Sequence, residues 1–217
     1  MPRFLHRFTM IGAVIPAIVL AAGKSTRMGR PKANLPLESG ETFLSRIVRT
    51  FYAAAVDDVV VVVGHEADAI VTAFSRTGAA ARFVTNPDYE NGQLSSLLRG
   101  LSAVDRPGVT AALVTLVDVP LVNADTVRAV IERYHQTHAP IVRPVRGQEH
   151  GHPVLIDRSL FDGIRRADPS GGAKLVVRLH ASALGDVQVD DDGAFRDIDT
   201  VYEYERVVGS RAAGNGP

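Results

Sequence analysis

A chain of 217 residues, 46% hydrophobic and 22% charged, has the composition of an ordinary globular protein with one domain. Its 24 basic and 24 acidic side chains cancel, so the overall charge gives no reason to expect a nucleic acid or a membrane surface as partner. The absence of cysteine excludes disulfides, thiolate metal sites and a cysteine nucleophile.

The N-terminal residues are separable from the rest of the chain. Basic side chains precede an apolar run, Met10–Ala22, which superficially resembles a secretory signal. Pro16 interrupts this run, which is also too short to span a bilayer. We therefore expect a cytoplasmic protein with three parts: an N-terminal extension at 1–12, a single domain at 13–208 and a disordered Gly/Ala-rich tail at 209–217.

Apolar runs alternate with helical patterns as far as His138. The sequence predicts strands at Ala17–Leu20, Asp58–Val63, Arg82–Thr85 and Ala111–Val117. The second of these reads DVVVVV, which is typical of a strand covered on both faces. Amphipathic helices are expected at Glu41–Ala55, Glu66–Ser75, Gln93–Val104 and Ala124–His135. This order predicts an α/β fold with an open, mostly parallel, Rossmann-like sheet and helices on both faces.

Beyond His138 the pattern loosens. Short strands are expected on either side of a Gly/His-rich turn at 147–152, at Pro140–Arg143 and Pro153–Ile156. The remaining predicted elements are helices at Arg158–Arg166, Ala173–His180 and Val201–Val208 and a strand at Asp186–Val189. The acidic run Asp190–Asp192 is expected to be a solvated turn.

The loop after the first predicted strand, Leu20–Lys32, concentrates positive charge. It reads LAAGKSTRMGRPK and places four cations within nine residues: Lys24, Arg27, Arg30 and Lys32. Ligands of open α/β sheets bind outside the carboxyl ends of the strands, and the small residues of the loop let backbone N–H groups approach phosphate oxygens. The loop therefore predicts a grip for a nucleoside triphosphate; the alternative is a surface turn with solvated charges.

A Walker P-loop is excluded. Gly23-Lys24-Ser25-Thr26 matches the end of that motif, but Ile18 stands where the motif needs its first glycine.

Two carboxylate positions are candidates for a metal. Asp118 ends the fourth predicted strand, where a carboxylate is poorly solvated unless it binds something. Mg²⁺ prefers one or two carboxylates together with phosphate oxygens. Farther along, Asp197 and Asp199 fall on one side of an extended segment. We expect Asp118 and Asp199 to hold Mg²⁺; Asp197 could replace Asp199, and turn or helix-capping roles are the alternatives.

Two further segments are candidates for contact with the substrates. Asn86 and Gly92 precede a predicted helix whose first turn holds Ser95 and Ser96, where N–H groups and hydroxyls can bind an anion. The alternative is a plainly capped helix start. The second segment is the turn formed by Gly151, His152 and Pro153, whose histidine has a structural role as its alternative.

The loop LAAGKSTRMGRPK resembles the signature of the MobA-like nucleotidyltransferases, and most closely their molybdenum cofactor cytidylyltransferase branch. The resemblance implies a three-layer α/β/α fold like that of the nucleotide-diphospho-sugar transferases. It implies that Gly23, Arg27 and Lys32 bind the NTP phosphates and that Asp118 binds the metal. Ala22 stands where the guanylyl branch has glycine, which favours CTP as the donor.

Other segments resemble motifs of the same branch, in the same order. Asn86–Ser96 is similar to its N-P-x-(W/Y)-x-x-G-x-x-x-S segment, and Gly151–Pro153 to its GHP motif at the acceptor pocket. The chain departs from the pattern at three places: Val119 replaces the glutamine of DQP, Val201 the proline of DIDTP, and Ser170–Lys174 replaces GDxGAR.

The resemblance implies transfer of CMP from CTP to the phosphate of molybdopterin, with Mg²⁺ and release of pyrophosphate. Arg27, Lys32 and Asp118 are the expected catalytic residues. The expected nucleotide contacts are Leu20, Ala21, Ala22, Gly23, Lys24, Arg27, Lys32, Asn86, Gly92, Ser95 and Ser96. The alternatives are another small phosphorylated acceptor, or a non-catalytic nucleotide-binding partner of a molybdoenzyme. Transient contact with a molybdoenzyme or its chaperone is also expected.

Overall fold

A computed structural model describes residues 14–168 and 171–212 of the chain. The expected N-terminal extension lies outside the described residues, as do positions 213–217. Within the described ranges, none of the helices combines the length and hydropathy that crossing a bilayer requires.

The described residues form an eight-stranded sheet with the strand order β3-β2-β1-β4-β7-β5-β6, and β8 pairs with β5. The strands are β1 (Ala17–Ala21), β2 (Val59–Val63), β3 (Arg82–Thr85), β4 (Ala111–Leu116), β5 (Ile141–Arg146), β6 (Glu149–His150), β7 (Val154–Asp157) and β8 (Asp186–Gln188). The helices are α1 (Phe43–Ala53), α2 (Ala67–Ser75), α3 (Gln93–Val104), α4 (Ala124–Thr137), α5 (Phe161–Arg165), α6 (Gly172–His180) and α7 (Val201–Ala212). Short 3-10 helices are η1 (Thr26–Met28), η2 (Lys32–Asn34), η3 (Tyr89–Asn91), η4 (Arg158–Leu160) and η5 (Asp192–Phe195).

The strands β1 to β4 pair in parallel, with β1 between β2 and β4. The strands β7 and β5 then join antiparallel beside β4, while β8 runs parallel to β5. The predicted α/β fold with an open, mostly parallel sheet is confirmed. The strand order reverses at β1, because β2 and β3 lie on one side of it and β4 on the other. The carboxyl ends of β1 and β4 therefore form the crevice where such sheets bind ligands.

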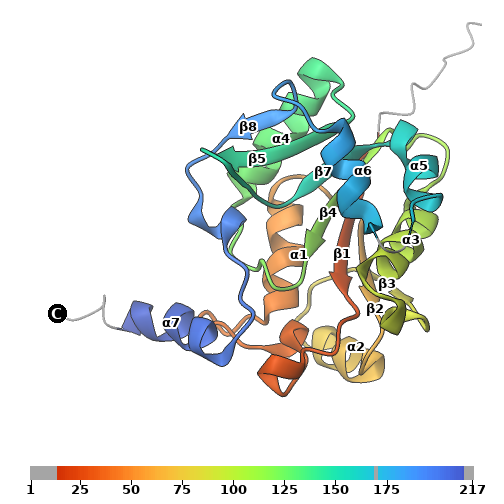
Figure 1. Cartoon of the computed structure of the whole chain (residues 1–217). Helices are drawn as coiled ribbons and strands as arrows, with labels where there is room; N and C mark the ends of the chain where they lie inside the picture. The colour runs from red at the N-terminus through yellow and green to blue at the C-terminus, as the bar shows by residue number, and fades with distance from the viewer. Residues whose placement is uncertain (1–13, 169–170, 213–217) are drawn as a thin grey trace, which may run out of the picture.

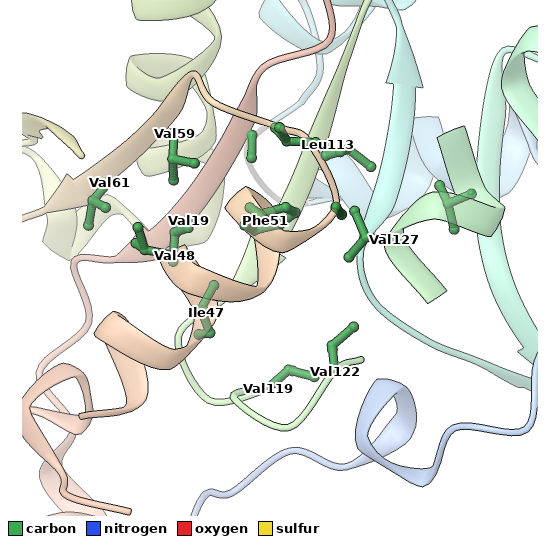
Figure 2. Packing of buried hydrophobic residues seen from close by; sticks show 14 of the residues in the cluster. Val19, Ile47, Val48, Phe51, Val59, Val61, Leu113, Val119, Val122 and Val127 are labelled. Carbon is green, nitrogen blue, oxygen red and sulfur yellow. The ribbon is translucent and has the colours of Figure 1, made fainter. Parts of the chain in front are cut away.

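Helices cover both faces of the sheet (Figure 1). On one face α1, α2 and α4 bury Val19, Val61 and Leu113, and Figure 2 shows Phe51 and Val48 of α1 packed against these strands. On the other face α3 and α5 bury the alternate residues of the same strands, including Ile18 and Val60. Burial on both faces explains why β2 is an uninterrupted run of valines.

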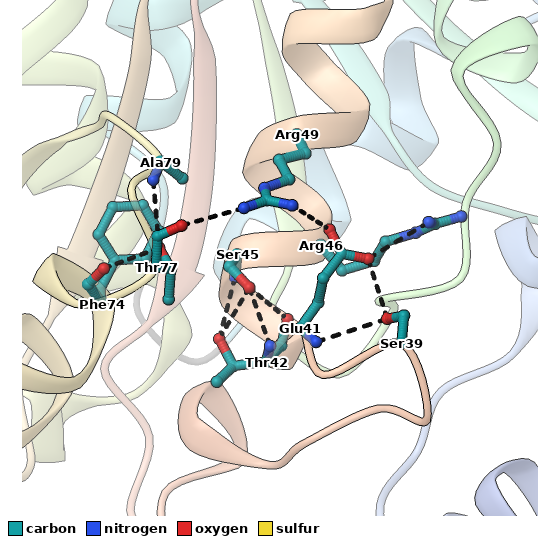
Figure 3. Close-up of polar contacts among 9 residues, drawn as sticks. All are labelled: Ser39, Glu41, Thr42, Ser45, Arg46, Arg49, Phe74, Thr77 and Ala79. Carbon is teal, nitrogen blue, oxygen red and sulfur yellow. Dashed lines mark hydrogen bonds and ion pairs between the residues drawn. The ribbon is translucent and has the colours of Figure 1, made fainter.

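The start of α1 fixes the segment that follows the loop after β1. The Thr42 side chain accepts from Ser45 N, and Ser45 Oγ accepts from Thr42 N, which is a reciprocal cap (Figure 3). Glu41 lies within 3.5 Å of guanidinium nitrogens of Arg46 and Arg49, and Arg49 also donates to Thr77 O. These contacts fix Glu41 and Thr42, the end of the segment that follows Lys32, to the first turns of α1.

The structure corrects three expectations about local structure. The turn expected at 147–152 contains a short strand, β6, because two residues are enough to pair with β5. The last helix continues to Ala212, beyond its predicted end at Val208. Asp191 is not part of a solvated turn: it is 6% exposed and accepts hydrogen bonds from α4 and from the chain before it. The division into one domain with two extensions stays a prediction.

Candidate active site

A cavity of about 360 Å³ opens at the carboxyl ends of β1 and β4. Its lining comes from the loop after β1, the start of α3, the end of β4 and the segment before α7: Leu20, Ala22, Gly23, Ser25, Thr26, Arg27, Lys32, Tyr89, Gly92, Gln93, Ser96, Leu116, Val117, Asp118 and Asp199. Segments far apart in the sequence therefore meet in one cleft, at the place where the sheet topology predicts it.

The loop between β1 and η2 keeps a fixed shape through backbone contacts. Ser25 has a φ of +50°, and the turn it starts is closed by a bond from Met28 N to Ser25 O of 2.9 Å. Ser25 Oγ accepts from Lys32 N at 3.2 Å and thus joins the two ends of the loop. Space above Gly23 is open, since no atom lies within 4 Å of where a β-carbon would stand. A phosphate group can approach the backbone at this point.

Lys32 is the buried cation of the site. Its side chain is 10% exposed, and its ammonium lies 3.0 Å from Asp118 Oδ2 and also in contact with Asp199 Oδ1. Arg27 is exposed, and its guanidinium lies 2.8 Å from the other oxygen of Asp199, Oδ2. Two cations from the loop after β1 are thus paired with carboxylates from the end of β4 and from the segment before α7.

The Asp118 carboxylate keeps one oxygen without a partner. Asp118 Oδ1 is buried and accepts no hydrogen bond, which is costly for a carboxylate. Asp118 and Asp199 converge on the same positive charge, that of Lys32. A divalent cation with oxygen ligands fits this pair, since it would take the unused oxygen and leave room for phosphate oxygens. Among the described residues no group of three or more His, Asp or Glu side chains is arranged to hold a metal, so the substrate would supply the remaining ligands.

The surroundings shift the pKa values of the neighbouring carboxyls in opposite directions. The hydrogen bond and charge of Lys32, followed by Arg27, lower the pKa of Asp199 against the effect of burial. Desolvation and then the Asp118 charge raise the pKa of Asp197, although this residue is exposed. Asp199 thus sits among cations and stays ionised, whereas Asp197 faces a like charge. This difference favours Asp199 over Asp197 as the partner of Asp118.

The start of α3 presents small groups to the cleft. Gly92, with a φ of +89°, and Ser96 line it directly. Asn86 does not: it has no exposed surface, and its Nδ2 donates to Ser95 Oγ at 2.9 Å and Ser96 Oγ at 3.0 Å. The expected direct contact of Asn86 with the nucleotide is therefore corrected to a supporting role, because its polar atoms are already bonded within the fold. Ser95 is likewise bonded to Asp88 O and Gly92 O.

Two other predicted nucleotide contacts lie outside the cleft. Ala21 is 4% exposed and belongs to the core beneath the loop. Lys24 is exposed and pairs with Glu90, whose hydrogen bond and charge raise the pKa of Lys24. Ala21 therefore does not contact a ligand in this cleft, and Lys24 would have to leave Glu90 to do so.

Tyr89 and Gln93 line the cleft although residue patterns did not single them out. The Tyr89 ring lies 5.9 Å from the His65 ring and packs over Gly64, where a β-carbon would stand 2.7 Å from Tyr89 Cβ. The aromatic position in the N-P-x-(W/Y) segment was the available signal for Tyr89. For Gln93, at the first position of α3, no signal in the sequence separated it from an ordinary helix start.

The Gly151–Pro153 turn lies beside the carboxylates and not in the cleft lining. A β-carbon on Gly151 would stand 2.6 Å from Ala194 O, so glycine is needed where the chain before α7 crosses this turn. Burial lowers the pKa of His152, opposed by its contact with Val114 O and by the charges of Asp197 and Asp118. On the side where the acceptor is expected, the structure therefore places a neutral imidazole, that of His152, near these carboxylates.

Val119, the departure from the DQP pattern, points away from the cleft. It lies on the loop after β4 and is fully buried in the cluster that also contains Ile47 of α1 and Val122 (Figure 2). Valine at this position therefore contributes to the core, and the Asp118 site does not depend on it.

A cationic loop after β1 and a carboxylate suited to a metal after β4, at the crevice of an open α/β sheet, are the arrangement of a nucleotidyltransferase. The chain belongs to the MobA-like NTP transferase family, whose domain model matches residues 17–186.

Similar proteins carry several names. The chain is 28% identical over 202 residues to a nicotine blue oxidoreductase of Paenarthrobacter nicotinovorans, covering 89% of this chain and 96% of that protein. It is 30% identical over 182 residues to a probable molybdenum cofactor guanylyltransferase of Mycobacterium tuberculosis, covering 81% and 85%. The crystal structure of Rv0371c from Mycobacterium tuberculosis superposes with a TM-score of 0.75 at 28% identity, covering 91% and 98%. A second structure of Rv0371c is a complex with manganese.

Proposed function

We propose that this protein transfers a CMP moiety from CTP to the phosphate of molybdopterin and releases pyrophosphate, with Mg²⁺ as the metal. The observation that carries the proposal is the Lys32 ammonium held between Asp118 and Asp199 in the cleft after β1. The cation suits phosphate oxygens, and the carboxylates suit a divalent metal.

The resting ion pairs of the cleft explain how the substrates enter. In the structure Lys32 and Arg27 pair with the same carboxylates that would hold the metal. The phosphates of CTP would take Lys32 and Arg27 as partners, and Asp118 and Asp199 would then be free to hold a divalent metal. The cations would exchange carboxylate partners for phosphates, and the carboxylates would exchange cationic side chains for the metal. Because no charge would be left buried without a partner, the nucleotide and the metal should favour each other's binding.

The transfer itself needs no protein nucleophile. A phosphate oxygen of the acceptor forms a bond to the α-phosphorus of CTP, and the bond to the β-phosphate oxygen breaks with its electron pair leaving on pyrophosphate. Mg²⁺, when bound, offsets negative charge on the phosphates. Lys32 and Arg27 stabilise the charge that develops on the leaving group, and the fixed loop holds the reacting atoms in line.

The preference for CTP rests on Ala22. This residue lines the cleft at 4% exposure, and its methyl carbon lies 3.0 Å from where a β-carbon on Gly64 would stand. Ala22 is therefore packed closely against Gly64, and the glycine of the guanylyl branch would leave more room beside the cleft at this point. Because relatives are named for guanylyl transfer, the donor is the part of the proposal that an experiment must decide.

The test measures pyrophosphate release by the purified protein with CTP or GTP, Mg²⁺, and either molybdopterin or a panel of sugar phosphates. We expect release with CTP and molybdopterin and formation of a cytidylylated product. The variant Ala22→Gly should shift the ratio of CTP to GTP use towards GTP by about tenfold, as one methyl group allows. Preference of the unaltered protein for GTP would refute the role of Ala22.

The choice of acceptor in this test distinguishes the proposed function from its two alternatives. Transfer only to a sugar phosphate would keep nucleotidyl transfer and replace molybdopterin. Binding of CTP without transfer to any acceptor would indicate a nucleotide-binding partner of a molybdoenzyme and refute catalysis.

A further inference from the structure

The connection between β8 and α7, residues 189–200, is called the strap below. It runs from β8 past the loop that follows β4 and ends at α7 (Figure 1). It carries Asp199 to the cleft, and Ile198 N donates to Asp118 O at 2.8 Å. The relative position of Asp118 and Asp199 therefore depends on how the strap is held against the loop after β4.

Asp191 is the buried charge of the strap. It is 6% exposed, and both of its oxygens are used. Oδ2 accepts from Asn123 N at 2.9 Å and from Thr126 Oγ1 at 2.6 Å. Oδ1 accepts from Asn123 Nδ2 at 2.9 Å and from Gly193 N at 3.1 Å. The carboxylate thus joins the start of α4 to the strap.

The way α4 begins gives this carboxylate a role that a local cap would not have. Asn123 is the N-cap of α4, but its own side chain makes no capping hydrogen bond. Asp191 of the strap instead accepts from the backbone N–H of Asn123 and from the Thr126 hydroxyl in the first turn, and its negative charge suits the positive end of the helix. A side chain within α4 would stabilise the helix alone, whereas Asp191 also fixes the strap.

The strap packs closely against the loop that follows β4. A β-carbon on Gly193 would stand 2.0 Å from Leu121 O, so the two backbones are in direct contact. Ala194 O accepts from His152 N at 2.8 Å on the other side. The strap is therefore held at 191–194 and again at Ile198, and both contacts flank the cleft carboxylates.

We propose that Asp191 is a positioning residue of the nucleotidyl transfer site, which sets the distance between the Asp118 and Asp199 carboxylates by tying the strap to the start of α4. The inference rests on the proposed function. Asp191 touches no substrate and acts only through the two segments that it joins.

The test is Asp191→Asn, which keeps the size of the side chain but turns one acceptor oxygen into a donor facing other donors. We expect Mn²⁺, titrated by electron paramagnetic resonance at one fixed CTP concentration, to bind the variant at least about tenfold more weakly than the unaltered protein. The metal concentration for half-maximal pyrophosphate release should rise in the same direction.

The matched control is Asp157→Asn, at the end of β7 and opposite Ala111, the first residue of β4. Asp157 accepts from Ser159 N at 2.8 Å and lies 2.7 Å from the Tyr134 hydroxyl, so it too is a well-bonded carboxylate at a helix start. The control should lower the melting temperature without changing the affinity for Mn²⁺. A purely structural Asp191 would behave in the same way, and that result would overturn the proposal.

Thr126→Val provides the second variant, in case Asp191→Asn does not fold. It removes one hydrogen bond to Asp191 and should weaken Mn²⁺ binding in the same direction by a smaller factor. Unchanged Mn²⁺ affinity in Thr126→Val, when Asp191→Asn cannot be purified, would overturn the proposal. Absence of transfer by the unaltered protein would instead refute the proposed function, while the Mn²⁺ titration would still decide the role of Asp191.

Discussion

The two ends of the parallel sheet use the same kinds of charged side chains in opposite ways. At the amino ends of the strands two carboxylates are each paired with two arginines: Asp58 lies between Arg82 and Arg106, and Asp105 between Arg158 and Arg165. At the carboxyl ends one ammonium, that of Lys32, serves two carboxylates, and one oxygen of Asp118 has no partner.

The completeness of pairing separates the ion pairs that stabilise the fold from those that ligands could replace. Arginines that close on one carboxylate hold neighbouring strands and loops together, as Arg82 of β3 does with Asp58 before β2. In the cleft the pairing is incomplete, so substrate phosphates and a metal can replace the resting partners at low cost. The predictions below change one end at a time.

The largest effect is expected from Asp118→Asn. The change keeps the size of the side chain and removes the charge at the end of β4, so turnover should fall by about 10³-fold, as for the loss of several kcal/mol of metal stabilisation. The rate of pyrophosphate release at saturating CTP measures it. An Asp118→Asn protein that keeps a tenth of the original turnover would refute the metal role of Asp118.

A smaller but still large loss is expected from Lys32→Ala. Removing the ammonium should lower turnover by about 10²-fold or more, because charge on the leaving pyrophosphate loses its main donor. The control is Arg158→Ala, which breaks an ion pair at the opposite end and should leave turnover unchanged. Near-normal pyrophosphate release by Lys32→Ala would remove that residue from the mechanism.

The smallest effect is expected from Asp105→Asn, and it should appear in stability alone. Hydrogen bonds from Arg165 and Arg158 lower the pKa of Asp105. A lowered pKa means that the folded state favours the carboxylate, so the contribution is present above the ordinary aspartate pKa and is lost as the pH falls. We expect the variant to lose about 1 kcal/mol at neutral pH, with the difference from the unaltered protein closing below about pH 4.

Urea unfolding at several pH values measures this difference, and pyrophosphate release is measured alongside it. A stability gap that widens in acid would contradict the assigned charge state. Loss of turnover without loss of stability would contradict the separation of the two ends.

The regular elements of the first half of the chain could be predicted because each has a strong local pattern. The predicted strand at Arg82–Thr85 and helix at Gln93–Val104 match β3 and α3 at both ends. The run DVVVVV predicted a doubly covered strand, and β2 is buried at every position. The two-residue strand β6 was missed because its only requirement is pairing with β5.

The site was predictable in its residue types and not in its contacts. The charges of the loop and the place of Asp118 were visible locally, whereas the bonds of Lys32 to Asp118 and Asp199 join residues 86 and 167 positions apart. The burial of Asp191 is not predictable from the sequence for the same reason. A run of three aspartates looks solvated, and only donors from α4, more than sixty positions earlier, make one of them a buried acceptor.

The exchange of ion-pair partners in the cleft is the central claim, and calorimetric titration of the protein with CTP tests it most directly. The titration is done once with Mg²⁺ and once with EDTA. Since Lys32 and Arg27 must leave Asp118 and Asp199 before they can bind phosphates, we predict binding about tenfold tighter or more with Mg²⁺, within the usual range of coupling between ligands. Equal affinity in the two titrations would contradict the account, because the carboxylates would then have no part in admitting the nucleotide.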